Sequence, residues 1–169
     1  QIEVPVLVDV AVKEQQEAGR SVMIVRHGSQ WLGVLGLADQ PRLEARDVLV
    51  RLREIGLRPL VMLTGDNRGV ADAIGKTLGV DEIKADLLPE DKVSAIQALM
   101  QKHGPLAMIG DGVNDAPALA QATVGIAMGG AGTGVALETA DVALMGDDLR
   151  TLPFAVGLSR QAARIIRQN

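Results

Sequence analysis

Two carboxylates stand four residues apart in residues 109–118, directly after an apolar run that predicts a strand at residues 106–109. Asp111 follows this strand, and Asp115 opens the next predicted helix. Open α/β sheets bind their ligands at the carboxyl ends of their strands. A carboxylate there suits a hard cation such as Mg²⁺, and N–H groups at a helix start suit phosphate. The pattern predicts a magnesium and phosphate site; the alternative is a Gly-Asp turn in which Asn114 or Asp115 caps a helix.

Two other stretches supply groups of the same kind. The apolar strand predicted at residues 59–63 ends in Thr64, Gly65 and Asp66, which offer a hydroxyl and backbone N–H groups to phosphate oxygens. The alternative for this loop is a helix N-cap, since Asp66 and Asn67 are both good caps. Lys92, early in a predicted helix, offers a compact cation; alone it is equally an ordinary solvated lysine. Together a hydroxyl, an ammonium group and carboxylates on one edge are what phosphoryl transfer requires.

Strand and helix patterns alternate along most of the chain. They predict an α/β fold, a Rossmann-like parallel sheet with helices on both faces. A helix and a β-hairpin precede it and form a small α+β unit, and the break at residues 39–42 predicts two domains, 1–38 and 39–169. The predicted helices are 6–17, 43–55, 69–78, 89–103, 115–121, 135–139 and one ending at 167, and the predicted strands are 21–26, 31–37, 59–63, 82–85, 106–109, 124–128 and 142–145.

Composition excludes several classes of protein. The chain of 169 residues is 47% hydrophobic with a net charge of −4, and it holds one Trp, one Phe and no Tyr. We therefore expect an aliphatic core and no nucleic-acid partner. Absence of cysteine excludes disulfides and thiolate metal sites. Residues 116–137 carry no charge, but Pro117 and five glycines predict loops and a buried strand there, not a membrane span.

Three motifs resemble the phosphorylation domain of P-type ATPases, a member of the haloacid dehalogenase superfamily. They are Thr-Gly-Asp-Asn at 64–67, Leu-Pro-Glu-Asp-Lys at 88–92 and Gly-Asp-Gly-Val-Asn-Asp-Ala-Pro-Ala-Leu at 110–119. The resemblance extends over roughly residues 20–169. It implies that residues 1–38 are the C-terminal remnant of a nucleotide-binding domain and that residues 39–169 are the C-terminal part of the phosphorylation domain, ending at the membrane stalk. Thr133 and residues 135–141 and 165–169 are similar to the heavy-metal-transporting branch, closer to its zinc, cadmium or cobalt members than to its copper members.

The resemblance implies catalytic roles for five residues. Thr64 and Lys92 would hold the transferred phosphoryl group, and Gly65 would add its backbone. Asn114 and Asp115 would orient the phosphate and Lys92.

The same resemblance implies Mg²⁺ and ATP as cofactors. Asp111 would bind Mg²⁺, and Asp66 would lie near the nucleotide phosphates. Arg42, in the stretch that matches the hinge before the phosphorylation domain, would touch the phosphates of ATP, or it is a surface residue at a helix start.

One part of the family pattern is absent. The motif Asp-Lys-Thr-Gly-Thr, which carries the phosphorylated Asp, does not occur in this sequence. In the family its strand lies between those ending here at Thr64 and Ile109, so we expect unpaired sheet edges in the middle of the fold. Either another chain supplies that strand, or this is a fragment of a larger polypeptide and the missing N-terminal part of the same pump supplies it, or the chain has rearranged. Asp9 also follows an apolar run and is an alternative nucleophile; Gly134 replaces an Asp of the family.

We therefore predict a cytoplasmic fragment of an integral cell-membrane protein, an ATP-driven heavy-metal pump with an aspartyl-phosphate intermediate. Without the nucleophile the fragment is expected to be inactive. Arg160, Arg164 and Arg167 recur at helical spacing, which suits either a solvated face or a stalk on the cytoplasmic side of a membrane. The alternatives are a free-standing haloacid dehalogenase-type phosphatase and a non-catalytic interaction fragment.

Overall fold

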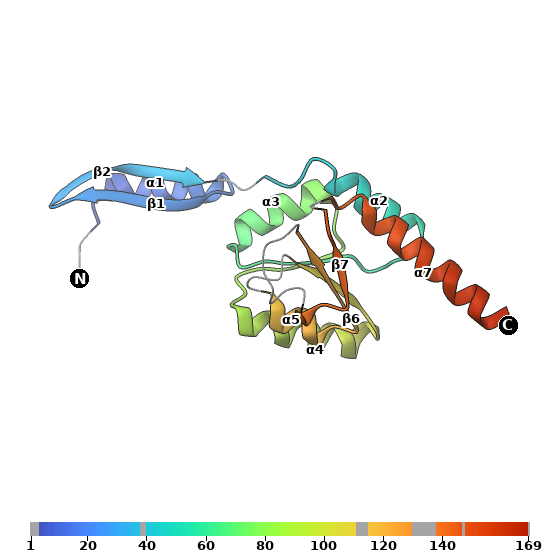
Figure 1. Ribbon diagram of the computed structural model, residues 1–169. Coiled ribbons are helices and arrows are strands. Elements are labelled where there is room, and N and C mark those ends of the chain that lie inside the picture. The colour runs from blue at the N-terminus through green and yellow to red at the C-terminus, as the bar shows by residue number, and fades with distance from the viewer. Residues whose placement is uncertain (1–3, 38–39, 111–114, 130–137, 147, 169) are drawn as a thin grey trace.

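The computed structural model describes residues 4–37, 40–110, 115–129, 138–146 and 148–168. Figure 1 shows a slender unit of one helix and one hairpin beside a larger unit in which helices surround parallel strands. Within the described ranges no helix is both long enough and apolar enough to cross a membrane.

The slender unit is the predicted helix followed by the predicted hairpin. Helix α1 (Val6–Glu17) precedes the antiparallel strands β1 (Ser21–His27) and β2 (Gln30–Leu37). Trp31 lies in this hairpin, with the guanidinium of Arg26 5.4 Å from the centre of its ring. None of the residues of α1 is buried.

Asp9 lies on helix α1 and not at the end of a strand. Its carboxylate pairs with Lys13 one turn later, at 2.8 Å, and both side chains are exposed. The structure therefore gives no support to the alternative in which Asp9 is a nucleophile at a strand tip.

The larger unit contains the remaining elements in the predicted order, with ends within two residues of the predicted ones wherever the structure describes them. They are α2 (Ala45–Glu54), β3 (Val61–Leu63), α3 (Arg68–Leu78), β4 (Glu82–Lys84), α4 (Pro89–His103), β5 (Ala107–Gly110), α5 (Ala116–Gln121), β6 (Val124–Met128), β7 (Val142–Leu144) and α7 (Thr151–Gln168). Most of the helix predicted at 135–139 lies outside the described residues.

The strands form two parallel sheets where the sequence pattern suggested one. Strand β3 pairs with β4, and β5, β6 and β7 form a second sheet in that order. In the described part of the chain β3 and β5 do not pair with each other. This is the expected outcome for a fold that lacks a strand between them, so the prediction of unpaired edges is confirmed.

A cavity of about 340 Å³ lies between β3 and β5. Consecutive residues line it from the segment before β3, at 57–60, and from β5, at 107–109, while β3 itself contributes Val61 and Leu63. A sheet face would contribute alternate residues, so the consecutive residues of β5 indicate that its edge faces the cavity. Strand β3 borders the same cavity and, among the described strands, pairs only with β4. Aliphatic side chains from the flanking helices complete its walls: Leu49, Leu52, Ile96, Leu99, Leu152 and Val156.

Two aliphatic clusters form the core, one on each side of the strands. Helices α2 and α7 pack on one side, with Val48, Leu52, Ile126 and Leu152 buried together. Helices α4 and α5 cover the other side, as Figure 1 also shows. The buried members there are Ile96, Met108, Ala118 and Leu119. The expected core without aromatic residues is confirmed for the described residues.

The carboxylate of Asp81 joins three elements of the larger unit. Leu60 N donates to Asp81 Oδ2 at 2.7 Å, and Arg53 of α2 donates to Oδ1 at 3.1 Å. Arg53 also donates to the carbonyl of Gly79, at the end of α3. The Leu60 N–H, followed by the Arg53 guanidinium, lowers the pKa of Asp81 below its ordinary value.

Replacing Asp81 by alanine should destabilise the larger unit. Loss of the acceptors for Leu60 and Arg53 should lower the free energy of unfolding by about 1–2 kcal/mol at pH 7, measured by urea denaturation. Because the folded-state pKa is lowered, this stabilisation is present above the unfolded-state pKa of about 3.9 and is lost as pH falls through the folded-state pKa. The difference between wild type and variant should therefore shrink at pH 3.

Asp72→Ala is the matched control. This carboxylate pairs with Arg68 of the same helix at 2.9 Å, and its side chain is 51% exposed. The substitution should change the free energy of unfolding by no more than about 0.5 kcal/mol. Equal losses for Asp72→Ala and Asp81→Ala would contradict the assigned role of Asp81.

Candidate phosphoryl-transfer site

Lys92 and Asp115 form a partly buried ion pair. Lys92 Nζ lies 2.6 Å from Asp115 Oδ1, and each side chain is only 17% exposed. Lys92 is therefore not the solvated lysine of the alternative interpretation. The structure brings together two of the residues that the sequence placed in the site.

The local sequence fixes both members of this pair. Pro89 occupies the first turn of α4, and the carboxylate of Asp91 accepts from Leu88 N at 3.0 Å, which closes the helix start. Asp115 stands at the N-cap position of α5. A Cβ on Gly110 would lie 2.8 Å from Asp115 Oδ2, so glycine at the end of β5 allows the carboxylate to lie against the strand.

The loop after β3 is held against the segment that leads into α4. Leu87 N donates to Thr64 O at 3.1 Å, and Asp86 N donates to Asp66 O at 2.8 Å. A Cβ on Gly65 would lie 3.2 Å from the carbonyl oxygen of Leu87, so the two backbones approach closely. Residues 84–87 therefore support this loop, a role that the sequence pattern did not predict. Asp86 adopts a positive φ of 57° in this segment, and the signal in the sequence is only its residue type, since Asp tolerates this conformation better than most residues.

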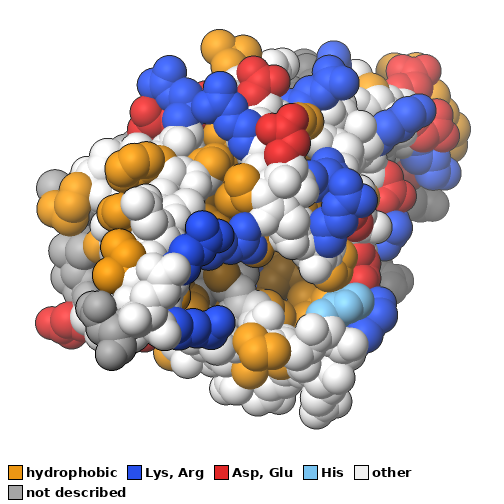
Figure 2. All heavy atoms as spheres, turned by 90° about the vertical axis from the view of Figure 1, so that its right-hand side faces the viewer, with side chains coloured by type: hydrophobic (Ala, Val, Ile, Leu, Met, Phe, Trp, Pro, Cys, Tyr) orange, Lys and Arg blue, Asp and Glu red, His pale blue; other side chains and the backbone are white. Residues whose placement is uncertain are grey.

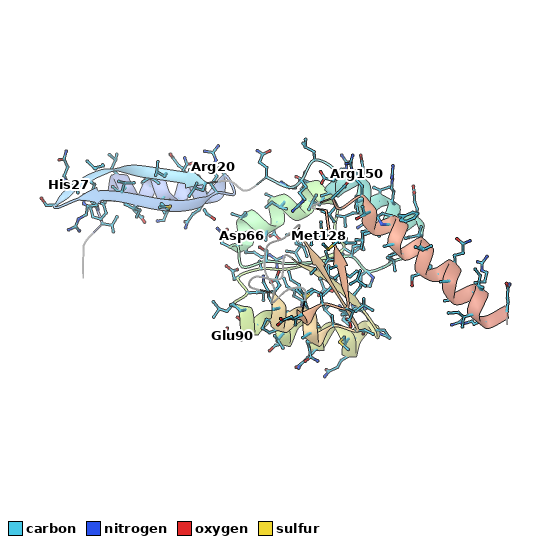
Figure 3. All side chains as sticks on the ribbon, in the orientation of Figure 1. Arg20, His27, Asp66, Glu90, Met128 and Arg150 are labelled. Carbon is cyan, nitrogen blue, oxygen red and sulfur yellow. The ribbon has the colours of Figure 1, made fainter. Side chains whose placement is uncertain are left out.

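Two residues that both suit a helix cap have different functions here. Asn67 caps α3, since its side-chain oxygen accepts from Val70 N at 3.1 Å. Asp66 instead contacts the hydroxyl of Thr64: Thr64 Oγ1 donates to Asp66 Oδ2 at 2.8 Å and accepts from Asp66 N at 3.1 Å. The cap interpretation is therefore wrong for Asp66 and right for its neighbour. Figure 3 shows Asp66 and Glu90, in the first turn of α4, on the same side of the larger unit.

The remaining predicted residues are placed less completely. Asp111 and Asn114 lie outside the described residues, as does Gly134. Arg42 is exposed ahead of α2, and its carbonyl accepts from Ala45 N at 3.0 Å.

The oxygen donors at this edge are of the kind that Mg²⁺ prefers. They are the carboxylates of Asp66 and Asp115 and the hydroxyl of Thr64, all hard ligands. Within the ranges that the structure describes, which exclude Asp111, no group of three or more His, Asp or Glu residues could hold a metal ion. The chemistry of the donor set fits Mg²⁺, and a complete site needs a ligand beyond the described residues.

The cavity between the sheets reaches this edge. Leu63, Ile109 and Asp115 line it at the carboxyl ends of the strands, and Arg58 and His103 belong to its lining as well. Figure 2 shows a hollow with a hydrophobic floor on the surface of the molecule. A strand in this cavity would therefore end beside the Lys92–Asp115 pair.

One protein family matches more than half of this chain. The family described as "Hydrolase: haloacid dehalogenase-like hydrolase" matches residues 6–123. The chain belongs to the haloacid dehalogenase-like hydrolase family. The mixed α/β fold and its parallel strands agree with this membership.

Similar haloacid dehalogenase-like proteins include metal-transporting ATPases. A probable cadmium-transporting ATPase of Staphylococcus aureus is 54% identical over 158 residues, which is 94% of this chain and 20% of that protein. A zinc-exporting P-type ATPase of Mycobacterium marinum is 46% identical, over 93% of this chain and 21% of its own length. The chain thus spans about a fifth of the curated relatives it matches.

A solved structure agrees over nearly the whole chain. The crystal structure of a zinc-transporting PIB-type ATPase in its E2.Pi state has a TM-score of 0.78 and 45% identity to this chain. It covers 97% of this chain, which spans 27% of that protein. The predicted resemblance to heavy-metal P-type ATPases is confirmed.

Replacing Lys92 by methionine should destabilise the chain. The substitution leaves the carboxylate of Asp115 partly buried without its cation, which should lower the free energy of unfolding by about 1–3 kcal/mol. Chemical denaturation at neutral pH measures the loss. The double variant Lys92→Met/Asp115→Asn should recover part of it, since the uncompensated charge is gone.

Lys102→Met is the control on the same helix. Lys102 pairs with Glu82 at 3.1 Å, but its side chain is 60% exposed, so we expect a change of at most about 0.5 kcal/mol. A loss as large as that of Lys92→Met would show that the Lys92–Asp115 pair has no special role in stability.

Proposed function

We propose that this chain is part of the cytoplasmic phosphorylation domain of an ATP-driven pump for a heavy-metal cation such as Cd²⁺ or Zn²⁺. The observation that carries the proposal is the Lys92–Asp115 pair at the mouth of a cavity between two open strand edges. The names of the relatives, cadmium-transporting and zinc-exporting ATPases, support the choice of cargo. The pump would pass through an aspartyl-phosphate intermediate on a residue outside this chain.

The residues of this chain would bind and position the phosphoryl group. The ammonium group of Lys92 would neutralise charge on the phosphoryl oxygens. Asp115 holds this group in place, with Lys92 Nζ 2.6 Å from Asp115 Oδ1. Thr64 would donate its hydroxyl and Gly65 its backbone N–H, while Asn114 would orient the phosphate. Mg²⁺, bound through Asp111, would supply further charge neutralisation when present.

ATP would approach the same edge. Asp66 lies in the loop beside Thr64, and Arg42 precedes α2 on the exposed surface. We propose that both residues lie near the nucleotide phosphates in the complete pump. Helix α7, with Arg160, Arg164 and Arg167, would lead towards the cytoplasmic face of the membrane.

The partner that this site requires is a parallel β-strand from the rest of the same pump. Open edges leave backbone N–H and C=O groups without strand partners, which is costly in an apolar environment. The walls of the cavity are aliphatic on both sides, so the strand should carry apolar residues on both faces. An Asp at its carboxyl end would reach the Lys92–Asp115 pair. The chain alone would bind phosphate groups at this edge but form no phosphoenzyme.

Complementation tests this proposal directly. The chain would be mixed with a separately produced N-terminal piece of the pump that carries Asp-Lys-Thr-Gly-Thr, and phosphoenzyme formation from radiolabelled ATP and Mg²⁺ would be measured. We expect labelling of the N-terminal piece only in the mixture. Labelling should fall at least about a hundredfold with Asp111→Ala or Lys92→Ala, because electrostatic stabilisation of phosphoryl transfer is lost.

Asp72→Asn serves as the charge-matched control and should leave the labelling unchanged, since Asp72 pairs with Arg68 on the exposed face of α3. Hydrolysis of ATP by the 169-residue chain alone, abolished by Asp111→Ala, would refute the proposal that the nucleophile lies elsewhere.

A further inference from the structure

The hydroxyl of Thr64 is already engaged in the structure. A carboxylate can only accept hydrogen bonds, so at 2.8 Å from Asp66 Oδ2 the single hydroxyl proton of Thr64 must be directed at Asp66. The backbone N–H of Asp66 donates back to Thr64 Oγ1 at 3.1 Å. The side chain of Thr64 is thereby locked by one residue through two hydrogen bonds.

This arrangement conflicts with phosphate binding as it stands. A sulfate dianion, or a phosphoryl group that has lost its protons, offers acceptors only, so a hydrogen bond from Thr64 to it needs the hydroxyl proton that Thr64 now donates to Asp66. Thr64 Oγ1 has no second proton to give. The hydroxyl must rotate from the carboxylate to the incoming anion, and a charge-assisted hydrogen bond must break as another forms.

The surrounding backbone cannot easily relieve the conflict. Leu87 N and Asp86 N hold the carbonyls of Thr64 and Asp66, and Gly65 lies close to the carbonyl of Leu87. The loop is therefore fixed on both sides of the Thr64 side chain, and the hydroxyl torsion is the degree of freedom that remains. Thr64 and Asp66 are both only partly exposed, so water competes weakly for this hydrogen bond.

We infer that Asp66 is a positioning residue that competes with the bound anion for the hydroxyl proton of Thr64. This inference rests on the proposed function in one respect, that Thr64 faces the phosphoryl group. It assigns Asp66 a further role, since the residue sets how readily Thr64 can donate. A cation that engages the Asp66 carboxylate would release the hydroxyl and so favour anion binding, which links the two binding events thermodynamically.

A double-mutant cycle on the full 169-residue chain tests the inference. Sulfate is the probe, because it keeps one charge state near neutral pH, and binding is followed by titration of backbone amide NMR signals. Asp66→Asn keeps the shape of the side chain and weakens its hold on the Thr64 proton. Thr64→Val removes the hydroxyl and keeps the shape of that side chain. The cycle compares the effect of Asp66→Asn with and without the hydroxyl.

With Thr64 present, Asp66→Asn should tighten sulfate binding about tenfold, because both the charge and the competition are reduced. In the Thr64→Val background the gain should be only about threefold, the effect of charge alone. Thr64→Ser, which keeps a hydroxyl, should restore the larger gain. Asp72→Asn, at an exposed carboxylate that pairs with Arg68 along α3, is the control and should change sulfate affinity less than twofold.

Equal gains in the two Thr64 backgrounds would overturn the inference, since Asp66 would then act through charge alone. Weaker sulfate binding in Asp66→Asn, or an equal gain in Asp72→Asn, would also overturn it. If wild type, Asp66→Asn and Lys92→Ala all showed no sulfate binding up to about 100 mM, the proposed anion site would be contradicted, and the inference with it. Amide spectra and thermal unfolding of each variant establish that it is folded.

Discussion

The unpaired edges of β3 and β5 are the constraint on which the rest of the structure depends. Strands β3 and β5 belong to two separate parallel sheets and border one cavity of about 340 Å³, and no described strand joins the sheets. The sheets are held together by side chains instead of backbone hydrogen bonds. Leu60 packs against the buried cluster of α2, β6 and α7, while Leu63 packs against that of α4, β5 and α5. The helices on both faces therefore set the width of the gap, and with it the size of the strand that can enter.

The same arrangement orders the edge where Thr64, Lys92 and Asp115 lie. Lys92 and Asp115 belong to helices α4 and α5, which pack together against β5, so their ion pair does not depend on the absent strand. The loop at Thr64 is tied by backbone hydrogen bonds to the segment before α4. The groups that would hold a phosphoryl group are consequently preorganised. In the proposed pump the Asp that accepts the phosphoryl group would come from outside this chain. The binding groups are therefore in place before the residue that reacts.

Much of the fold was predictable because aliphatic residues recur with clear helical or strand periods, and glycines such as Gly79 end the helices. The pairing of Lys92 with Asp115 followed from three specific motifs. The ties made by Asp81 and by residues 84–87 were not predicted, because they join positions distant in sequence through single side chains or backbone groups. The choice between Asp66 and Asn67 as helix cap was also beyond sequence reasoning, since both residue types suit that position. Asp111, the most specific residue of the pattern, lies outside the described residues.

The scarcity of aromatic residues has an optical consequence. Trp31 is the only tryptophan of the chain, tyrosine is absent, and this indole lies in the hairpin beside Arg26. Intrinsic fluorescence excited at the indole band therefore reports on the slender unit alone. Events at the edge where Thr64, Lys92 and Asp115 lie are spectroscopically silent unless they propagate to the hairpin. The two units can thus be followed separately, one by its indole emission and the other by backbone signals.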